Sequence, residues 1–109
     1  MDKKSILTDR QIASVRAYQK MLMQAGVAVE RMIVFGSYAK GTPNKWSDLD
    51  VCVVSPQFGK HPFDEGVLLA RYAMRIDEFI EPHPYNPKDL ADKYDPLASE
   101  IRKYGIQVV

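Results

Sequence analysis

Two aspartates, Asp48 and Asp50, stand two residues apart and lead into an apolar run at residues 51–54. Alternate residues of a β-strand share a face, so we expect the two carboxylates to project together and Leu49 to point the other way. Carboxylates about 6 Å apart repel by roughly 3 kcal/mol at an effective dielectric constant near 20. A divalent cation offsets this repulsion, and paired oxygen ligands suit a Mg²⁺ ion that also binds substrate phosphates. The pair therefore predicts a metal site.

Gly36 and Ser37 add a second chemical feature upstream of the pair. They follow directly on a short β-rich run, Arg31–Phe35, and ten residues separate Ser37 from Asp48. A glycine and a serine at such a turn offer backbone N–H groups and a hydroxyl to an anion. An isolated Asp-x-Asp is more often a solvated pair or a turn than a metal site. The joint pattern of phosphate donors and metal ligands, however, is what a nucleotidyl-transfer site requires.

This joint pattern resembles the signature of the DNA-polymerase-beta-type nucleotidyltransferase superfamily. The chain is most similar to the minimal, single-domain members called MNT proteins, through Gly36-Ser37-Tyr38-Ala39-Lys40-Gly41 and Ser47-Asp48-Leu49-Asp50-Val51. The resemblance implies that Asp48 and Asp50 hold two catalytic Mg²⁺ ions, and that Gly36 and Ser37 contact the phosphates of the nucleotide, ATP.

Tyr38 and Lys40 belong to the same motif and are further candidates for nucleotide binding. Tyr38 can stack or hydrogen-bond near the nucleotide, but an aromatic ring packed beneath the turn is an equal alternative. Many minimal members carry arginine at the position of Lys40. Lysine keeps the positive charge for the triphosphate but loses the bidentate contact, and most surface lysines are simply solvated.

The resemblance also implies a third carboxylate from the next strand, as in other two-metal sites. Residues 76–82 offer Asp77 and Glu81 on one face of an extended strand, about 13 Å apart, so that only one can serve the metal pair. We expect Glu81 to be this catalytic metal ligand, because the stretch from Ile80 to Pro84 resembles the corresponding strand of minimal members. His83 is compatible with a place beside the metal, a proton shuttle, or a structural role at the end of the strand.

Apolar spacing and the positions of glycine and proline predict the elements that position these residues. We expect strands at 31–35 and 48–54 and within 76–83, the last ended by prolines, and an apolar tail at 106–109 that packs or pairs. Helices are expected at about 9–25, 64–75, 86–89 and 96–104. The predicted fold class is α/β (α+β): one nucleotidyltransferase domain over residues 1–109, with a small mixed sheet that carries the carboxylates on one face and helices on the other.

Composition and charge exclude several classes of protein. The 109 residues are 46% hydrophobic and 27% charged, typical of one soluble globular domain rather than a disordered chain. A net charge of +1 gives no bulk reason to bind nucleic acid or a membrane. Cys52 is the only cysteine, which excludes an intramolecular disulfide and indicates a reducing compartment. The start of the chain has no apolar leader, so we expect a cytoplasmic protein.

The function implied by the resemblance is Mg²⁺-dependent transfer of AMP from ATP to a hydroxyl. Larger superfamily members carry extra domains that bind the acceptor, so here we expect another protein or another copy of the chain to complete the site. Many minimal members are antitoxins that adenylylate a tyrosine of a HEPN-type toxin, which predicts such a partner. The main alternative is a non-catalytic binding module that neutralises a partner by covering it. A small-molecule nucleotidyltransferase is less favoured.

Overall fold

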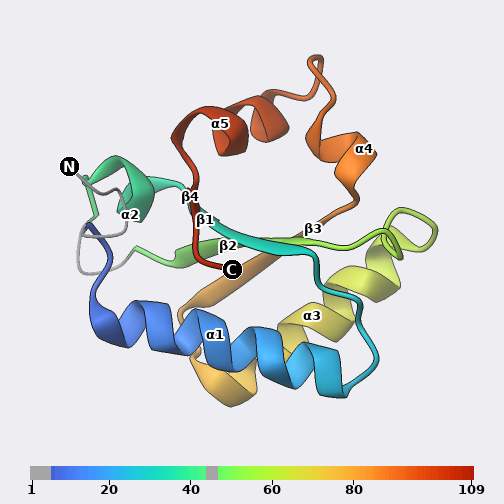
Figure 1. The fold of residues 1–109 in the computed structure, drawn as a ribbon, viewed down its shortest axis with the longest axis horizontal. Helices are drawn as coiled ribbons and strands as arrows, with labels where there is room; N and C mark the ends of the chain where they lie inside the picture. The colour runs from blue at the N-terminus through green and yellow to red at the C-terminus, as the bar shows by residue number, and fades with distance from the viewer. Residues whose placement is uncertain (1–5, 44–46) are drawn as a thin grey trace.

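The computed structural model describes residues 6–43 and 47–109 (Figure 1). Within them, four strands form one sheet in the order β3-β2-β1-β4. The strands are β1 (Arg31–Phe35), β2 (Leu49–Val54), β3 (Ile80–Tyr85) and β4 (Ile106–Gln107). The helices are α1 (Asp9–Gln24), α2 (Ser37–Lys40), α3 (Pro62–Ile76), α4 (Pro87–Leu90) and α5 (Pro96–Tyr104). The sheet is mixed, because β1 is antiparallel to β2 and β4 while β2 and β3 are parallel.

One face of the sheet is covered by α1 and α3, which lie side by side beneath it in Figure 1. Alternate residues of β1 and β2 point into this core. Among them are Met32, Val34, Val51 and Val53, all fully buried. From α1, Tyr18 reaches across and donates its hydroxyl to a carbonyl of α3. This layer holds most of the buried apolar residues and fixes which strand residues point to the other face.

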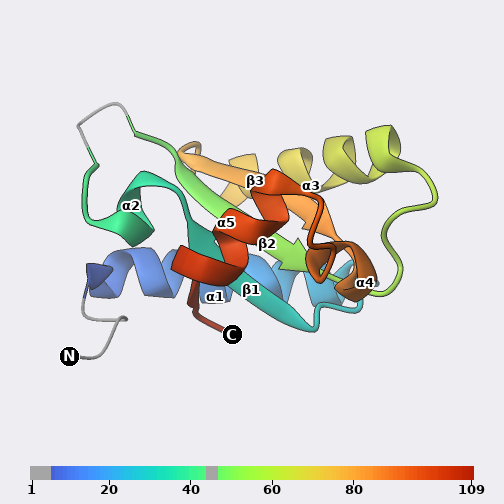
Figure 2. The same cartoon turned by 90° about the horizontal axis from the view of Figure 1, so that it is seen from above.

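The opposite face carries apolar side chains as well, and α4 and α5 lie over it (Figures 1 and 2). Ile33, Phe35 and Cys52 are buried there against residues of these two helices, including Ile101. The predicted mixed α/β class is therefore confirmed. The sequence predicts helices only on the face opposite to the carboxylates, where α1 and α3 lie. In the structure, α4 and α5 also pack on the other face. The second layer exists because alternate residues of β1 and β2 are apolar on both faces and need cover from water.

The third strand is shifted along the chain relative to the sequence prediction. We expected it within residues 76–83 and ended by Pro82, but β3 runs past both Pro82 and Pro84. The carbonyl of Tyr85 accepts a hydrogen bond from the N–H of Ser55, the residue that follows β2, so the backbone N–H and C=O groups of odd-numbered β3 residues point toward β2. The two prolines then face the open edge, where a missing N–H costs no ladder bond. Prolines here mark an edge strand, not the end of a strand.

Other predicted elements agree closely with the structure. The strand at 31–35 and the helix at 96–104 have the expected bounds, and the apolar tail pairs with β1 as β4. The helix predicted at about 9–25 is α1, which begins after Thr8. The Thr8 hydroxyl accepts a hydrogen bond from Gln11 N–H, and the Gln11 side-chain carbonyl accepts one from Thr8 N–H, so the two residues form a capping box. No helix in residues 6–43 or 47–109 is long and apolar enough to cross a membrane.

Candidate active site

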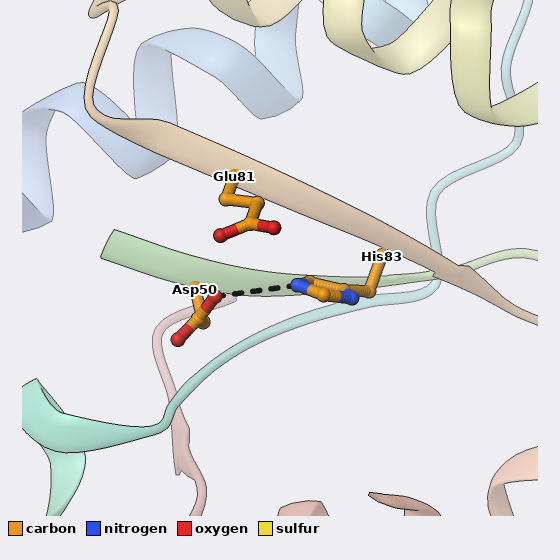
Figure 3. Close-up of side chains that lie close together, drawn as sticks. All are labelled: Asp50, Glu81 and His83. Carbon is orange, nitrogen blue, oxygen red and sulfur yellow. Dashed lines mark hydrogen bonds and ion pairs between the residues drawn. The ribbon is translucent and has the colours of Figure 1, made fainter. Parts of the chain in front are cut away.

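Asp50, Glu81 and His83 come together on the sheet face that α4 and α5 share (Figure 3). Asp50 of β2 lies directly opposite Glu81 in the parallel ladder, and His83 follows Glu81 by two residues, so it shares the same face. One ligand atom from each of the three side chains lies within 4.8 Å of the others. The Nε2 atom of His83 is 3.3 Å from Oδ1 of Asp50. The register of two strands therefore builds the cluster.

The burial pattern of β2 explains why Asp50 points to this face. Leu49 and Val51, its neighbours in the chain, are buried against the α1 and α3 layer. Alternation then places the Asp50 side chain on the opposite face, where 24% of it is exposed. A one-residue slip of β2 would bury the carboxylate in the apolar core, so the hydrophobic pattern fixes the position of the acid.

The neighbouring charges on this face shift the pKa of Glu81. Partial burial raises the pKa of the Glu81 carboxyl, and the negative charge of Asp50 raises it further. The charge of Asp48 adds to the same effect, while His83 opposes it. An upward shift means that a second negative charge is disfavoured at this position. A bound cation would remove that penalty.

Gly36 brings the turn after β1 into contact with the carboxylate of Asp50. Its backbone has φ +75° and ψ −152°, a region that only glycine adopts readily. A Cβ atom added to Gly36 would lie 2.3 Å from Oδ2 of Asp50. The turn is held there because Phe35, the last residue of β1, pairs with Asp50 in the antiparallel ladder. Ser37 follows at once as the first residue of α2.

Asp48 lies one residue before β2 rather than inside it, and its side chain is exposed. The predicted strand at 48–54 therefore begins one residue later than expected. Leu49 is buried, as alternation predicted. Asp48 is not among the three side chains whose ligand atoms converge, although it is near enough to influence the pKa of Glu81. The structure places Asp48 at the rim of the cluster.

Asp77 has a different place from the one expected for an alternative third carboxylate. It caps the C-terminus of α3, and its Oδ1 accepts a hydrogen bond of 2.9 Å from Phe79 N–H. It also lines a cavity of about 200 Å³ with residues that include Thr8 and Tyr38. The expectation that Asp77 and Glu81 share a strand is wrong, because β3 begins only at Ile80. Glu81, and not Asp77, lies opposite Asp50.

Tyr38 and Lys40, the two other candidates for nucleotide binding, make their contacts outside the cluster of Asp50, Glu81 and His83. Tyr38 is half-buried and packs against the core on the α1 side, which is the second of its two predicted alternatives. Lys40 forms an ion pair with Glu100 of α5, and this contact raises the pKa of Lys40. The Lys40 ammonium also lies 5.2 Å from the centre of the Tyr104 ring. A nucleotide contact by either residue stays a prediction.

His83 is the member of the cluster for which the sequence leaves three roles open: a place beside the metal, a proton shuttle, or a structural role. Its ring packs edge-on against Phe35, with centroids 4.9 Å apart and an interplanar angle of 66°. The signal that could have found it is its spacing of two from Glu81, which places both on one strand face. The prolines on either side obscured that signal, because they suggested that the strand had already ended.

The donor set of this face fits a divalent cation. Asp50 and Glu81 offer carboxylate oxygens, and His83 offers a ring nitrogen. The contact between Gly36 and Asp50 brings the backbone of the following turn beside those oxygens. Carboxylates and imidazole are the usual protein ligands of divalent metals. Metal ligands and the backbone of a glycine turn, a common place for phosphate to bind, thus adjoin one another.

Comparisons with known proteins find relatives of this chain in sequence and in fold. The chain is 28% identical over 82 residues to a candidate protein adenylyltransferase of Methanocaldococcus jannaschii, a match that spans 73% of this chain and 79% of that protein. Its fold is similar to the crystal structure of a candidate nucleotidyltransferase from Sulfolobus solfataricus, with a TM-score of 0.64, 17% identity, and coverage of 90% of this chain and 78% of that one.

A second solved structure with a similar fold comes from a toxin–antitoxin crystallised with AMP-PNP. The TM-score is 0.60 at 20% identity, and the match covers 85% of this chain and 71% of that chain. The family of nucleotidyltransferase domains matches residues 16–105, which contain β1, β2 and β3, the glycine turn and all three carboxylates. The chain therefore belongs to the nucleotidyltransferase domain family, as the motif predicted.

Proposed function

We propose that this nucleotidyltransferase moves AMP from ATP to a hydroxyl group of a partner toxin, and that it acts as an antitoxin. One observation carries the proposal: Asp50 meets both Glu81 across the parallel ladder and Gly36 at the end of β1. Acidic ligands and a phosphate-binding turn are thereby in contact. This is the combination that nucleotidyl transfer needs, because charge develops on phosphate oxygens during the reaction.

In the proposed site, Asp50, Glu81 and Asp48 hold Mg²⁺, in the two-ion arrangement that the family resemblance implies. A bound magnesium ion would supply positive charge to the α-phosphate and to the leaving pyrophosphate. The backbone N–H groups and the hydroxyl at Gly36 and Ser37 orient the phosphates beside these carboxylates. The exposed side chains of Asp48 and Glu81 keep this face open to an incoming acceptor.

The reaction is an in-line displacement at the α-phosphorus of ATP. The acceptor hydroxyl gives its proton to water, and its oxygen forms a new bond to the α-phosphorus. The bond from that phosphorus to the bridging oxygen breaks, AMP remains on the acceptor, and pyrophosphate leaves. Positioning by the turn and the carboxylates lowers the barrier, because the attacking oxygen and the phosphate are held together.

The names of one relative and one structural neighbour support a protein as the acceptor. The M. jannaschii relative is named as a candidate protein adenylyltransferase, and one structural neighbour is a toxin–antitoxin with a bound ATP analogue. We propose that the acceptor is a tyrosine hydroxyl of a HEPN-type toxin. The partner would present that tyrosine at the open end of the sheet face beside Asp50.

The test is a transfer assay with α-labelled ATP, Mg²⁺ and the purified product of a neighbouring toxin gene. We expect label on the toxin, no label with γ-labelled ATP, and no label when the acceptor tyrosine is changed to phenylalanine. Asp50→Asn should lose transfer, whereas Asp77→Asn should keep it. Neutralisation of the toxin by Asp50→Asn at full strength without labelling would contradict the proposal and favour a non-catalytic binding module.

A further inference from the structure

We propose that Nε2 of His83 is a direct ligand of the metal ion bound by Asp50 and Glu81, and that the site therefore selects Mn²⁺ and related transition-metal ions over Mg²⁺. The inference rests on the metal site of the proposed function and goes beyond it. It assigns a ligand outside the acidic motif and a class of ion to the site. The family resemblance covers the strand that contains His83, but it assigns the metal to the carboxylates and gives His83 no ligand role.

The spacing of the three side chains is the first observation. Their ligand atoms all lie within 4.8 Å of one another. With bonds of about 2.1 Å, two ligands on opposite sides of one ion are at most about 4.2 Å apart. The cluster therefore reaches bonding distance through small side-chain rotations, with no change in the register of β2 and β3. Figure 3 shows all three side chains directed toward the same space.

The orientation of the imidazole is the second observation. The ring is held edge-on by Phe35, and Nε2 is the atom that faces Asp50, at 3.3 Å. About a quarter of the His83 side chain is exposed, so the ring is packed but still reachable by an ion. A ligand whose rotamer is already fixed loses little conformational entropy on binding. Phe35 thus prepares His83 for coordination.

The identity of the donor atom sets the expected preference. Mg²⁺ takes oxygen ligands and keeps several waters, whereas the transition-metal ions also bind imidazole nitrogen, Mn²⁺ least strongly and Co²⁺ and Zn²⁺ more strongly. Replacing one water of a carboxylate site by imidazole should strengthen binding of these ions more than that of Mg²⁺. The rival interpretation is that His83 only donates a hydrogen bond to Asp50 and orients it. The two differ in whether a nitrogen is bonded to the metal.

Pulsed electron paramagnetic resonance of the Mn²⁺-loaded protein distinguishes them, because a bonded imidazole gives nitrogen modulation. The chain has only two histidines, His83 and His61, so His61→Gln is a matched control. We expect the modulation in the wild type and in His61→Gln, and its loss in His83→Gln. By calorimetric titration, His83→Gln should weaken Mn²⁺ binding at least about tenfold and Mg²⁺ binding less.

The outcomes separate this proposal from the proposed function. Mn²⁺ that binds the wild type without nitrogen modulation, or modulation that survives in His83→Gln, overturns the role of His83 but leaves the carboxylate site intact. Unchanged Mn²⁺ affinity in Asp50→Asn overturns the metal site itself. Circular dichroism and the thermal midpoint of each variant show whether it has kept its fold. An equal loss of Mn²⁺ and Mg²⁺ affinity in His83→Gln would also contradict the proposed selectivity.

Discussion

Asp50 is placed by three neighbours that come from different parts of the chain. Phe35 pairs with it in the antiparallel ladder, Glu81 faces it in the parallel ladder, and Gly36 lies against its Oδ2 atom. Two of these contacts come from backbone pairing and one from the lack of a side chain. The position of the acid is therefore a property of the sheet, and changes to the Asp50 carboxylate should affect chemistry more than folding.

The first prediction concerns the pKa of Glu81 in Asp50→Asn. Partial burial and the charge of Asp50 raise this pKa above its ordinary value of 4.5, so removal of that charge should lower it. A group with a raised pKa binds more protons in the folded state, so the free energy of unfolding falls as pH rises through that pKa. This fall should be smaller in Asp50→Asn.

Carbon-13 NMR titration of the Glu81 carboxyl measures the shift directly. Asp77→Asn is the control, because Asp77 lies at the end of α3 and is not among the charges that act on Glu81. If both variants leave the Glu81 titration where it is in the wild type, then Asp50 is not its electrostatic neighbour and the geometry of the site is wrong.

A second prediction compares two glycines with the same φ of +75°. Gly36→Ala places a methyl group against Asp50 and forces a backbone region that only glycine adopts, which should cost about 1–3 kcal/mol of stability. Gly41→Ala has no atom within 4 Å of its new Cβ and should cost about 1 kcal/mol. Chemical denaturation gives both values. Transfer activity should be lost only in Gly36→Ala, and similar activity in the two variants would argue against the contact.

The site residues show how far sequence reasoning reaches. Glu81 was chosen over Asp77 from the resemblance of its strand, and the structure brings it opposite Asp50. Strand alternation is local, so it can be read from the chain. The ion pair between Lys40 and Glu100 could not be read in this way, because it joins α2 to a helix near the other end of the chain. Contacts of that kind depend on how the layers pack.

At the scale of elements, glycine and proline at the boundaries explain which helix and strand limits could be predicted. Gly36 ends β1 and Pro96 begins α5, and both elements have the expected limits. Such residues act through their own backbone preferences, which are the same in any fold. The prolines of β3 misled because their meaning depends on which side of the strand is paired. That information is tertiary, and the sequence alone does not contain it.

Asp95 links two elements and provides a prediction about pH. Its carboxylate caps α5 by accepting from Leu97 and Ala98 N–H, and it also accepts from the hydroxyl of Tyr85 in β3. The N–H of Ala98 and then the Tyr85 hydroxyl lower the pKa of Asp95. A lowered pKa gives stability that is present above the ordinary aspartate value and is lost as pH falls through the folded-state pKa.

Asp95→Asn should therefore unfold more easily than the wild type at pH 7. The difference should begin to shrink below about pH 4, where Asp95 of the unfolded chain takes up its proton, and should be lost once the pH falls below the lowered pKa of the folded protein. Urea denaturation at several pH values measures this gap. Asp92→Asn is a matched loss of one negative charge, at a carboxylate that accepts a hydrogen bond from the nearby Tyr94 N–H. A gap for Asp95→Asn that is the same at pH 3 and pH 7 would show that the charge is unimportant.

At the scale of the whole molecule, the two faces of the sheet have different tasks. The face against α1 and α3 is packed with apolar residues such as Leu22, Val51 and Leu69. The other face is apolar beneath α5 and acidic near the N-terminal ends of β2 and β3, where Asp50 and Glu81 lie. Stability and chemistry should therefore respond to different substitutions, according to the face that each one touches.

Tyr18 tests this separation, because it is fully buried between α1 and α3 and its hydroxyl donates a 2.7 Å hydrogen bond to the Leu69 carbonyl. Tyr18→Phe keeps the ring and removes only that bond, so the free energy of unfolding should fall by about 0.5–1.5 kcal/mol. For a domain of this size, each kcal/mol corresponds to roughly 4–8 °C in thermal midpoint. Metal affinity and transfer rate below the melting range should stay at wild-type values, since the lost bond lies behind the sheet. Tyr94→Phe, at a tyrosine that is 82% exposed, controls for loss of a phenol and should leave the midpoint unchanged. A fall in metal affinity in Tyr18→Phe would mean that the two faces are coupled through the strands, and that packing of the α1 layer helps to set the spacing of Asp50 and Glu81.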